Sequence, residues 1–424
     1  MAIQSDNLRP PVSVGEGAGV KLTTAQLGLK ANWRQFTLLV IINGFVGAML
    51  GIERTLVPEL GRQVFHLEFT TAILSFIIVF GVVKATANYY AGSLANRIGR
   101  KNILVLGWLA ALPVPFILIY AGSWNWILLA NIFLGINQGL CWSTTVMMKI
   151  DLVGTSNRGL AMGLNEFAGY VSLGTVAFIT GYIASVHGLR PQPFYLGIAL
   201  SAAGLLSSIL LVKDTAGHVR KEAETTSSVP SANVFLDTTF RNRNLSSVTQ
   251  AGLVNNLNDG MMWGLFPLLL KSKGFDYAQI GIIVAVYPAV WGVTQLFTGF
   301  LSDKLSRKPL LFWGMLLQGL ALFAMAGSGN FYFYLFISVL LGLGTALVYP
   351  TFLAAVADFS HPIQRAKSIG VFRFWRDSGY VFGALITGIV MDRSGYTTAI
   401  IAVAVLTMLS ALVIQFRMRR KKIF

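Results

Sequence analysis

Long apolar runs separated by short polar breaks dominate this sequence from residue 36 onward. A helix needs about 20 predominantly apolar residues to cross the hydrocarbon core of a bilayer, and most of the runs have that length. We therefore expect an all-α membrane protein with twelve spanning helices. The predicted spans are 36–58, 70–92, 102–121, 125–150, 158–186, 193–212, 246–270, 278–301, 309–328, 331–357, 365–391 and 397–416.

The longest internal polar break falls in the middle of the chain. Residues 213–245 carry several charges and a run of threonine and serine, which predicts a linker between a six-helix bundle at 36–212 and a second bundle at 246–416. The first 35 residues predict a polar tail, and residues 417–424 predict a short basic tail. The start of the chain lacks the charged-then-apolar layout of a secretory signal, so the first apolar run is expected to remain as a span.

The composition agrees with a lipid environment. Hydrophobic residues make up 54% of the 424 residues and charged residues only 12%, whereas soluble domains are about 25% charged. The single cysteine, Cys141, excludes an internal disulfide, and the four histidines are widely spaced. The sequence therefore predicts no metal site and no cofactor.

The positions of lysine and arginine predict the orientation. Five of these 33 residues fall in loops on one side of the predicted membrane, and five lie within spans, which leaves 23 on the other side. Because basic loops stay in the cytoplasm, we expect both termini and the linker to be cytoplasmic, in an inner or plasma membrane. Within the spans, Lys149 is expected to reach the nearby membrane surface.

The two halves of the chain repeat each other. A shift of 207 places lays residues 80–188 on residues 287–395 without a gap, so that Arg100, Asp151 and Arg158 fall on Arg307, Asp358 and Arg365. Chance identity would not preserve one register through four spans. The halves are therefore expected to share one fold, related by an axis along the membrane normal. Six spans plus six spans with a cleft between them favour a transporter over a channel.

Two loops at equivalent places of the repeat carry a similar pattern of glycine and basic residues. Gly92-Ser-Leu-Ala-Asn-Arg-Ile-Gly-Arg-Lys101 follows the second span, and Gly299-Phe-Leu-Ser-Asp-Lys-Leu-Ser-Arg-Lys308 follows the eighth. In these loops, and over nearly the whole chain past residue 35, the sequence resembles the major facilitator superfamily. The resemblance implies two pseudo-symmetric six-helix bundles and transport by alternating access.

The resemblance also implies that these loops latch the halves together on the cytoplasmic side of an outward-facing state. The family usually has an aspartate at the fifth loop position, which is Asn96 in the first copy and Asp303 in the second. Arg100–Asp151 is the expected ion pair and Arg307–Asp358 its copy. The alternative is a solvated basic loop without a gating role. The predicted gating residues are Gly92, Arg97, Arg100, Asp151, Asp303, Arg307 and Asp358.

Polar and ionisable residues inside the spans are the candidates for substrate binding or coupling. A charge near the bilayer centre costs a few kcal/mol, so it usually faces a cavity or a partner. The candidates are Arg54, Lys84, Asn88, Asn137, Gln138, Glu166, Asn255, Asp259, Arg373, Arg376 and Asp377.

The spacing of some candidates predicts partners. Arg373 and Asp377 are four residues apart on one helix face, which favours an ion pair. Glu166 and Arg373 are equivalent in the repeat and have opposite charges, which favours a pair across the cavity. Asn255 and Asp259 share a helix face. The alternative for each is a structural pair between neighbouring helices.

Coupling to a proton gradient is the preferred energy source. The sequence contains no phosphate-binding Gly-x-x-x-x-Gly-Lys loop, which argues against ATP. An acid in a cavity can carry a proton, so Glu166 and Asp259 are candidates. The basic residues Arg54, Lys84 and Arg376 favour a small anionic or zwitterionic organic substrate.

Within the family the chain is most similar to drug and metabolite:proton antiporters, which implies efflux. Those antiporters typically carry a Gly-Pro pair in span five, whereas residues 163–169 contain no proline. Proton symport uptake and facilitated diffusion therefore stay open as alternatives. An enzyme would need a cluster of metal ligands or a nucleophile with a base, and the sequence shows no such cluster. The short tail and linker also leave no room for the output domain of a transporter-like sensor. We expect a monomer in the lipid bilayer that binds no nucleic acid.

Overall fold

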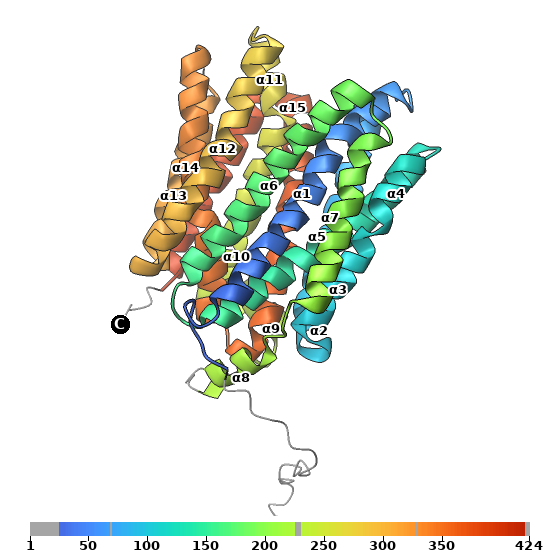
Figure 1. The fold of residues 1–424 in the computed structure, drawn as a ribbon. Helices are drawn as coiled ribbons and strands as arrows, with labels where there is room; N and C mark the ends of the chain where they lie inside the picture. Colours follow the sequence, from blue (N-terminus) through green and yellow to red (C-terminus); the bar gives the residue numbers. More distant parts are fainter. Residues whose placement is uncertain (1–24, 68–69, 225–229, 328, 420–424) are drawn as a thin grey trace, which may run out of the picture.

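The computed structural model describes residues 25–67, 70–224, 230–327 and 329–419, and nearly all of this range is helical (Figure 1). Parts of the predicted N-terminal tail (1–24), linker (225–229) and C-terminal tail (420–424) lie outside the described residues. The first half contains six spans: α1 (Trp33–Gln63), α2 (Thr70–Ile98), α3 (Arg100–Ala111) continued by α4 (Pro113–Tyr120), α5 (Trp124–Val153), α6 (Arg158–His187) and α7 (Gln192–Leu210).

The second half repeats this arrangement. Its helices are α10 (Arg243–Gly264) continued by α11 (Phe266–Ser272), α12 (Tyr277–Lys304), α13 (Arg307–Met325), α14 (Phe331–Phe359) and α15 (Arg365–Arg417). The 53-residue α15 forms two spans, because Gly395 has a φ of 83° and breaks the helical backbone between them. Glycine adopts this left-handed conformation without steric cost.

The described residues form twelve spans, and the predicted all-α fold class is confirmed. Nine helices of the described chain are long and apolar enough to cross a membrane by length and composition alone, with the two spans of α15 counted once. Span two is α2, and span seven is α10 with α11. The hydropathy of α10 is low because Asn255, Asn256, Asn258 and Asp259 follow each other closely. Helices suit this environment because lipid offers no partner for an unpaired backbone group.

The segment between the halves lies on one face of the molecule. It contains α8 (Ala216–Glu224), α9 (Val234–Leu236) and the short π-helix η1 (Asp237–Arg241). The face that carries α8 is called the linker face below. The start of α1 and the end of α15 lie toward the same face (Figure 1), and the backbone N–H of Arg419 donates to Asn244 at the start of α10.

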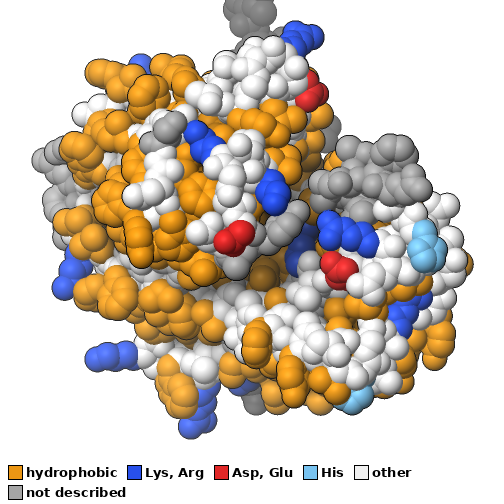
Figure 2. Space-filling view, turned by 90° about the horizontal axis from the view of Figure 1, so that it is seen from above, with side chains coloured by type: hydrophobic (Ala, Val, Ile, Leu, Met, Phe, Trp, Pro, Cys, Tyr) orange, Lys and Arg blue, Asp and Glu red, His pale blue; other side chains and the backbone are white. Residues whose placement is uncertain are grey.

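The halves touch each other mainly toward the linker face. There α2 packs on α15 and α6 packs on α12. A Cβ on Gly92 would clash with the carbonyl oxygen of Ala366, and a Cβ on Gly299 would lie 2.6 Å from that of Gly159. These contacts require glycine, because any side chain would push the helices apart. The opposite face is hollowed between two lobes (Figure 2).

Candidate functional site

Asp377 in α15 gathers polar side chains from three helices at the contact between the halves. Its Oδ1 lies 2.7 Å from Arg376, and its Oδ2 accepts a 2.6 Å hydrogen bond from Asn88 of α2. Asn256 of α10 donates to Oδ1 at 3.4 Å, and Nζ of Lys84 lies 4.0 Å from Oδ2. These five residues are called the Asp377 cluster. They combine two cations with one acid across the two halves.

The predicted pair of Arg373 with Asp377 is wrong. Among the described residues, no carboxylate lies within the 4.0 Å ion-pair distance of Arg373, although its side chain is 1% exposed. Its Nε and Nη1 also have no hydrogen-bond partner in the described chain. The adjacent Arg376 takes the carboxylate instead, because the side chain of Asp377 turns toward α2 and α10. Arg373 is thus a buried cation with free donors beside the Asp377 cluster.

The predicted pair of Glu166 with Arg373 is also absent from the described structure. Oε1 of Glu166 accepts hydrogen bonds from Nε1 of Trp142 at 3.0 Å and from Nδ2 of Asn165 at 2.8 Å. Both donors belong to the first half, and Glu166 is 1% exposed. Glu166 is therefore held inside its own half by neutral donors.

Asp259 lies in the second half and is completely buried. The hydroxyl of Tyr287 in α12 donates to Oδ1, and that of Tyr380 in α15 lies 3.5 Å from Oδ2. Thr345 of α14 extends the group, with its hydroxyl 3.2 Å from that of Tyr287. No cation of the described chain lies within ion-pair distance of Asp259. A buried carboxyl with only neutral partners is suited to bind a proton.

Aromatic side chains from both halves meet beside these acids. Tyr170 contacts Trp142 within the first half, with ring centres 5.6 Å apart, and contacts Trp291 of α12 at 4.4 Å. Its hydroxyl lies 3.2 Å from that of Tyr349 in α14. Arg376 lies over the ring of Tyr349, and Lys84 lies over that of Trp142. The rings therefore connect the two halves at the level of the charged residues.

Other predicted site residues lie outside this group. Asn137 donates to the carbonyl of Gly107 in α3, and Gln138 donates to that of Val46 in α1, so both join helices within the first half. Asn255 is 3.4 Å from the oxygen of Asn256, and among the described residues it forms no hydrogen bond with Asp259. Lys149 does not reach the membrane surface. It is buried and donates to the carbonyl of Leu39.

Arg54 is a separate cation on α1. Its guanidinium lies 5.6 Å and 5.1 Å from the ring centres of Phe76 and Phe80 in α2. Within the described residues it has no acidic partner at ion-pair distance. Lys84 also lies over Phe80, so this ring connects Arg54 to the edge of the Asp377 cluster.

The two predicted latch pairs are present on the linker face. Nε of Arg100 lies 3.1 Å from Asp151, and Nε of Arg307 lies 3.0 Å from Asp358. Arg100 and Asp151 are buried. Arg97 is exposed at the end of α2 and forms no ion pair with a described residue. The family resemblance therefore predicted the first pair and the repeat predicted its copy, while their part in gating stays a proposal.

Asp303 and Asn96 differ in chemistry although they are equivalent in the repeat. The carboxylate of Asp303 accepts 2.7 Å and 2.8 Å hydrogen bonds from the backbone N–H groups of Gly159 and Leu160, at the start of α6. Asn96 instead donates a 2.6 Å hydrogen bond to the carbonyl of Ile363. A helix N-terminus attracts negative charge, which only the aspartate supplies. The second copy is thus the stronger contact between the halves.

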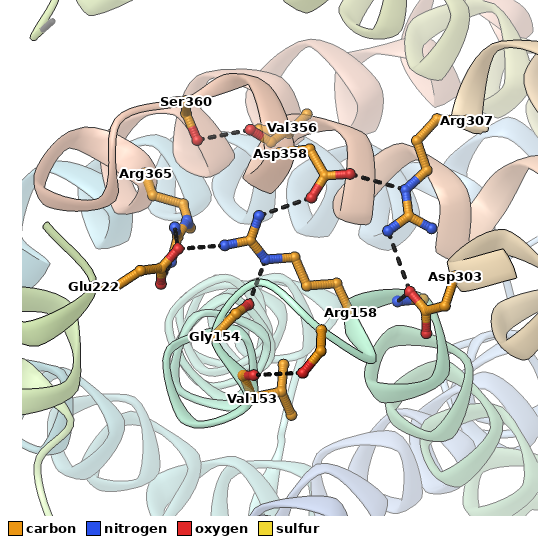
Figure 3. Close-up of polar contacts among 12 residues, drawn as sticks. Val153, Gly154, Arg158, Glu222, Asp303, Arg307, Val356, Asp358, Ser360 and Arg365 are labelled. Carbon is orange, nitrogen blue, oxygen red and sulfur yellow. Dashed lines mark hydrogen bonds and ion pairs between the residues drawn. The ribbon is translucent and has the colours of Figure 1, made fainter. Parts of the chain in front are cut away.

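Three further charged residues belong to this network and were not among the predicted gating residues. Arg158 and Arg365 begin α6 and α15, and Glu222 belongs to the linker helix α8. Figure 3 shows Glu222 between the two arginines, and Asp358 between Arg158 and Arg307. The repeat could have identified the two arginines, because Arg158 and Arg365 are 207 residues apart and therefore occupy equivalent positions in the two halves.

We expect Asp303→Asn to weaken the linker-face contact without disturbing the fold. The amide can accept only one of the two backbone hydrogen bonds that the carboxylate accepts, and it loses the attraction to the start of α6. Alkylation of a cysteine placed at the buried Ala366, in a Cys141→Ala background, should become about tenfold faster, as expected for a loss of about 1.4 kcal/mol in a charge-assisted contact. Asn96→Ala is the comparison and should have a smaller effect. An unchanged rate in Asp303→Asn would contradict the assignment.

Comparison with known proteins identifies the family. Residues 36–249 and 248–423 each match the family model described as Major Facilitator Superfamily. The chain belongs to the major facilitator superfamily. It is accordingly an integral multi-pass membrane transporter and not an enzyme.

Two staphylococcal transporters are similar in sequence. Quinolone resistance protein NorA of Staphylococcus aureus is 28% identical over 138 residues, which are 32% of this chain and 36% of NorA. The match thus spans only about a third of that relative. The proton-coupled antiporter flippase LtaA of Staphylococcus saprophyticus is 23% identical over 324 residues, which are 74% of this chain and 77% of LtaA.

Solved structures of superfamily transporters share the fold. The human organic anion transporter MFSD10 superposes with a TM-score of 0.71 at 16% identity, covering 90% of this chain and 99% of that one. The transporter FucP in its outward conformation gives a TM-score of 0.72 at 15% identity, covering 91% and 98%.

Proposed function

We propose that this superfamily transporter exports a small organic anion in exchange for protons. The observation that carries the proposal is the excess of buried basic groups where the halves meet. Lys84, Arg373 and Arg376 lie beside a single ion-paired acid, Asp377. Asp377 and Glu166 attract the charge of Arg373 without forming an ion pair, and its Nε and Nη1 have no hydrogen-bond partner in the described chain. Buried donors of this kind are costly unless a ligand meets them.

The site is suited to an anion that also has an apolar body. Carboxylate, sulfonate or phosphate oxygens can accept the free hydrogen bonds of Arg373 and pair with Lys84. The rings of Trp142, Tyr170, Trp291 and Tyr349 offer an apolar surface next to these charges. Lys84 is 14% exposed, whereas Arg373 and Arg376 are almost completely buried. We infer that the anion meets Lys84 first and reaches the arginines as the halves move.

Proton exchange is proposed for Asp259, with Glu166 as the second candidate. Both acids are buried and have only neutral hydrogen-bond donors around them in the described chain. Protonation of such an acid removes a buried charge that has no direct ion pair among the described residues. Exchange in the efflux direction is favoured by the similarity to LtaA, whose name records proton-coupled antiport, and to the resistance protein NorA.

We assign this structure to one end of the proposed cycle. The linker face is closed by glycine contacts and ion pairs, while the opposite face is hollowed (Figure 2). Rocking of one half against the other would open the linker face and close the hollow. With the linker face in the cytoplasm, this state would release exported anions to the outside.

Flux into proteoliposomes tests the proposed substrate class. Labelled benzenesulfonate and phenyltrimethylammonium are matched probes, since both carry a permanent charge on one aromatic ring and neither changes its charge with pH. We expect a pH gradient to drive benzenesulfonate against its concentration gradient and to leave the cation unmoved. Transport of the cation alone would overturn the proposal, and anion movement along with protons would favour symport.

The proposed orientation gives a topological prediction. Ala232, between α8 and α9, and Ser123, between α4 and α5, are both exposed. These two connections lie on opposite faces of the molecule (Figure 1). In a Cys141→Ala background, Ser123→Cys should react with an impermeant maleimide on intact cells, whereas Ala232→Cys should react only after the membrane is opened. The reverse pattern would place the linker outside.

A further inference from the structure

The linker helix α8 places one acidic side chain inside the contact between the two halves. Glu222 is 2% exposed, whereas Glu224 on the same nine-residue helix is exposed. A buried glutamate requires partners that replace its hydration. Its partners therefore show what the helix does at this position.

Two arginines from different halves hold Glu222 (Figure 3). Its Oε1 lies 2.5 Å from Nη2 of Arg158, at the start of α6, and 2.5 Å from Nη2 of Arg365, at the start of α15. Its Oε2 accepts a second bond from Nη1 of Arg365 at 2.8 Å. Because Arg158 and Arg365 are equivalent in the repeat, one carboxylate from the unrepeated linker joins two symmetry-related positions.

Each arginine also reaches toward the other half. Nη1 of Arg158 lies 2.7 Å from Asp358, and Nη1 of Arg365 lies 3.8 Å from Asp151. Asp151 and Asp358 are the acids of the two latch pairs. Glu222 therefore connects the latch of the first half to that of the second, and it neutralises part of the positive charge that the two arginines place together.

The linker is attached to both halves within a short stretch. Before α8, Thr215 donates to Asp151 at 2.8 Å, and the backbone N–H of Lys101 donates to Asp214 at 2.9 Å. About two turns later Glu222 holds Arg365 through two bonds. A helix rises about 1.5 Å per residue and does not stretch. When the halves separate at this face, the linker cannot keep all of these contacts.

We propose that Glu222 is a positioning residue for alternating access, which holds Arg158 and Arg365 together while the linker face is closed and releases Arg158 each time that face opens. Arg158 is the partner that leaves, because it gives Glu222 one bond while Arg365 gives two. The inference rests on rocking of the halves and is independent of the proposed substrate and proton sites.

The charge state of Glu222 supports this role at neutral pH. Burial opposes the charged form, but hydrogen bonds and the charges of Arg365 and Arg158 outweigh it, so the pKa of Glu222 lies below its ordinary value. A lowered pKa means that the contact is fully present above the usual titration range of glutamate and is lost only as the pH falls through the lowered value.

Cysteine alkylation of the purified full chain tests the proposal. The reporter is Ala366→Cys in a Cys141→Ala background, because Ala366 is buried in α15 against Gly92 of the other half. We expect Glu222→Gln to raise the rate of alkylation by N-ethylmaleimide about tenfold or more, since it removes charge-assisted bonds from the closed state only. Glu222→Asp should give an intermediate rate. Glu224→Gln is the matched control and should equal the parent.

A second measurement separates positioning from local loosening of α8. Spin labels at Ser123→Cys, before α5, and Ser272→Cys, at the end of α11, are both at exposed positions. They report the face opposite the linker, where α4 meets α5 and α11 ends (Figure 1). If Glu222 biases the whole cycle, Glu222→Gln should shorten this distance as the linker face opens. A parental alkylation rate, an equal increase in Glu224→Gln, or faster alkylation without a change in the spin-label distance would overturn the proposal. If Glu222→Gln aggregates, Glu222→Asp replaces it in both measurements. An alkylation rate and a spin-label distance equal to those of the parent would then overturn the proposal.

Discussion

Asp259→Asn should reduce pH-driven uphill transport to the level of empty liposomes while exchange of labelled for unlabelled substrate continues. Asparagine keeps the size of the side chain and can still bond to Tyr287, but it cannot bind and release a proton. Exchange needs only substrate binding and rocking, whereas uphill transport also needs a carried proton. The measurement compares both modes for one anionic substrate in the same proteoliposomes.

Controls on other acids sharpen this experiment. Asp276 starts α12, where its side chain accepts from the backbone of Gln279. Asp276→Asn keeps a good helix cap and should transport normally. Glu166→Gln tests the second candidate, because its carboxylate has two neutral donors of its own. If Asp259→Asn keeps pH-driven transport, Asp259 is not the proton carrier. If Glu166→Gln loses pH-driven transport while Asp259→Asn keeps it, the proton carrier is Glu166 in the first half.

The sequence predicted the parts of this fold that depend on periodicity and repetition. Lipid requires long apolar helices, so the spans could be found from hydropathy, and even α10 was found despite its amides. The shift of 207 residues predicted that Arg307 and Asp358 pair as Arg100 and Asp151 do. The family resemblance implied the first pair, and the equal separation in the second half carried it over to the second.

Contacts between distant segments could not be predicted in this way. Asp377 receives its hydrogen bond from Asn88, which is 289 residues earlier in the chain, and the four-residue spacing to Arg373 gave the wrong partner. The presence of a polar side chain in a span also does not predict which group the side chain contacts. Asn137 and Gln138 therefore looked like cavity residues, although they bond to backbone carbonyls inside the first half. Glu222 resembled an ordinary solvated charge of a linker.

Arg373→Gln should separate binding from stability more clearly than any other change at the site. Removing a hydrogen-bonded charge from a ligand contact costs about 1.5–3 kcal/mol, so the KM for an anionic substrate should rise about 10–150-fold. The fold should not suffer, because Nε and Nη1 of Arg373 have no partner to lose in the described chain. The thermal unfolding temperature should stay the same or rise, since an unpaired buried cation disappears.

Arg376→Gln is the matched control for this prediction. It lies three residues away on the same helix with a similarly buried guanidinium, but it is bonded to Asp377. Breaking a buried pair by removing one partner costs about 3–5 kcal/mol, so this variant should unfold at a clearly lower temperature. If Arg373→Gln instead loses stability and keeps its KM, then Arg373 serves the packing of the halves, and the anion must be held by Lys84 and Arg54. If it keeps both stability and KM, the excess of buried positive charge does not determine the substrate.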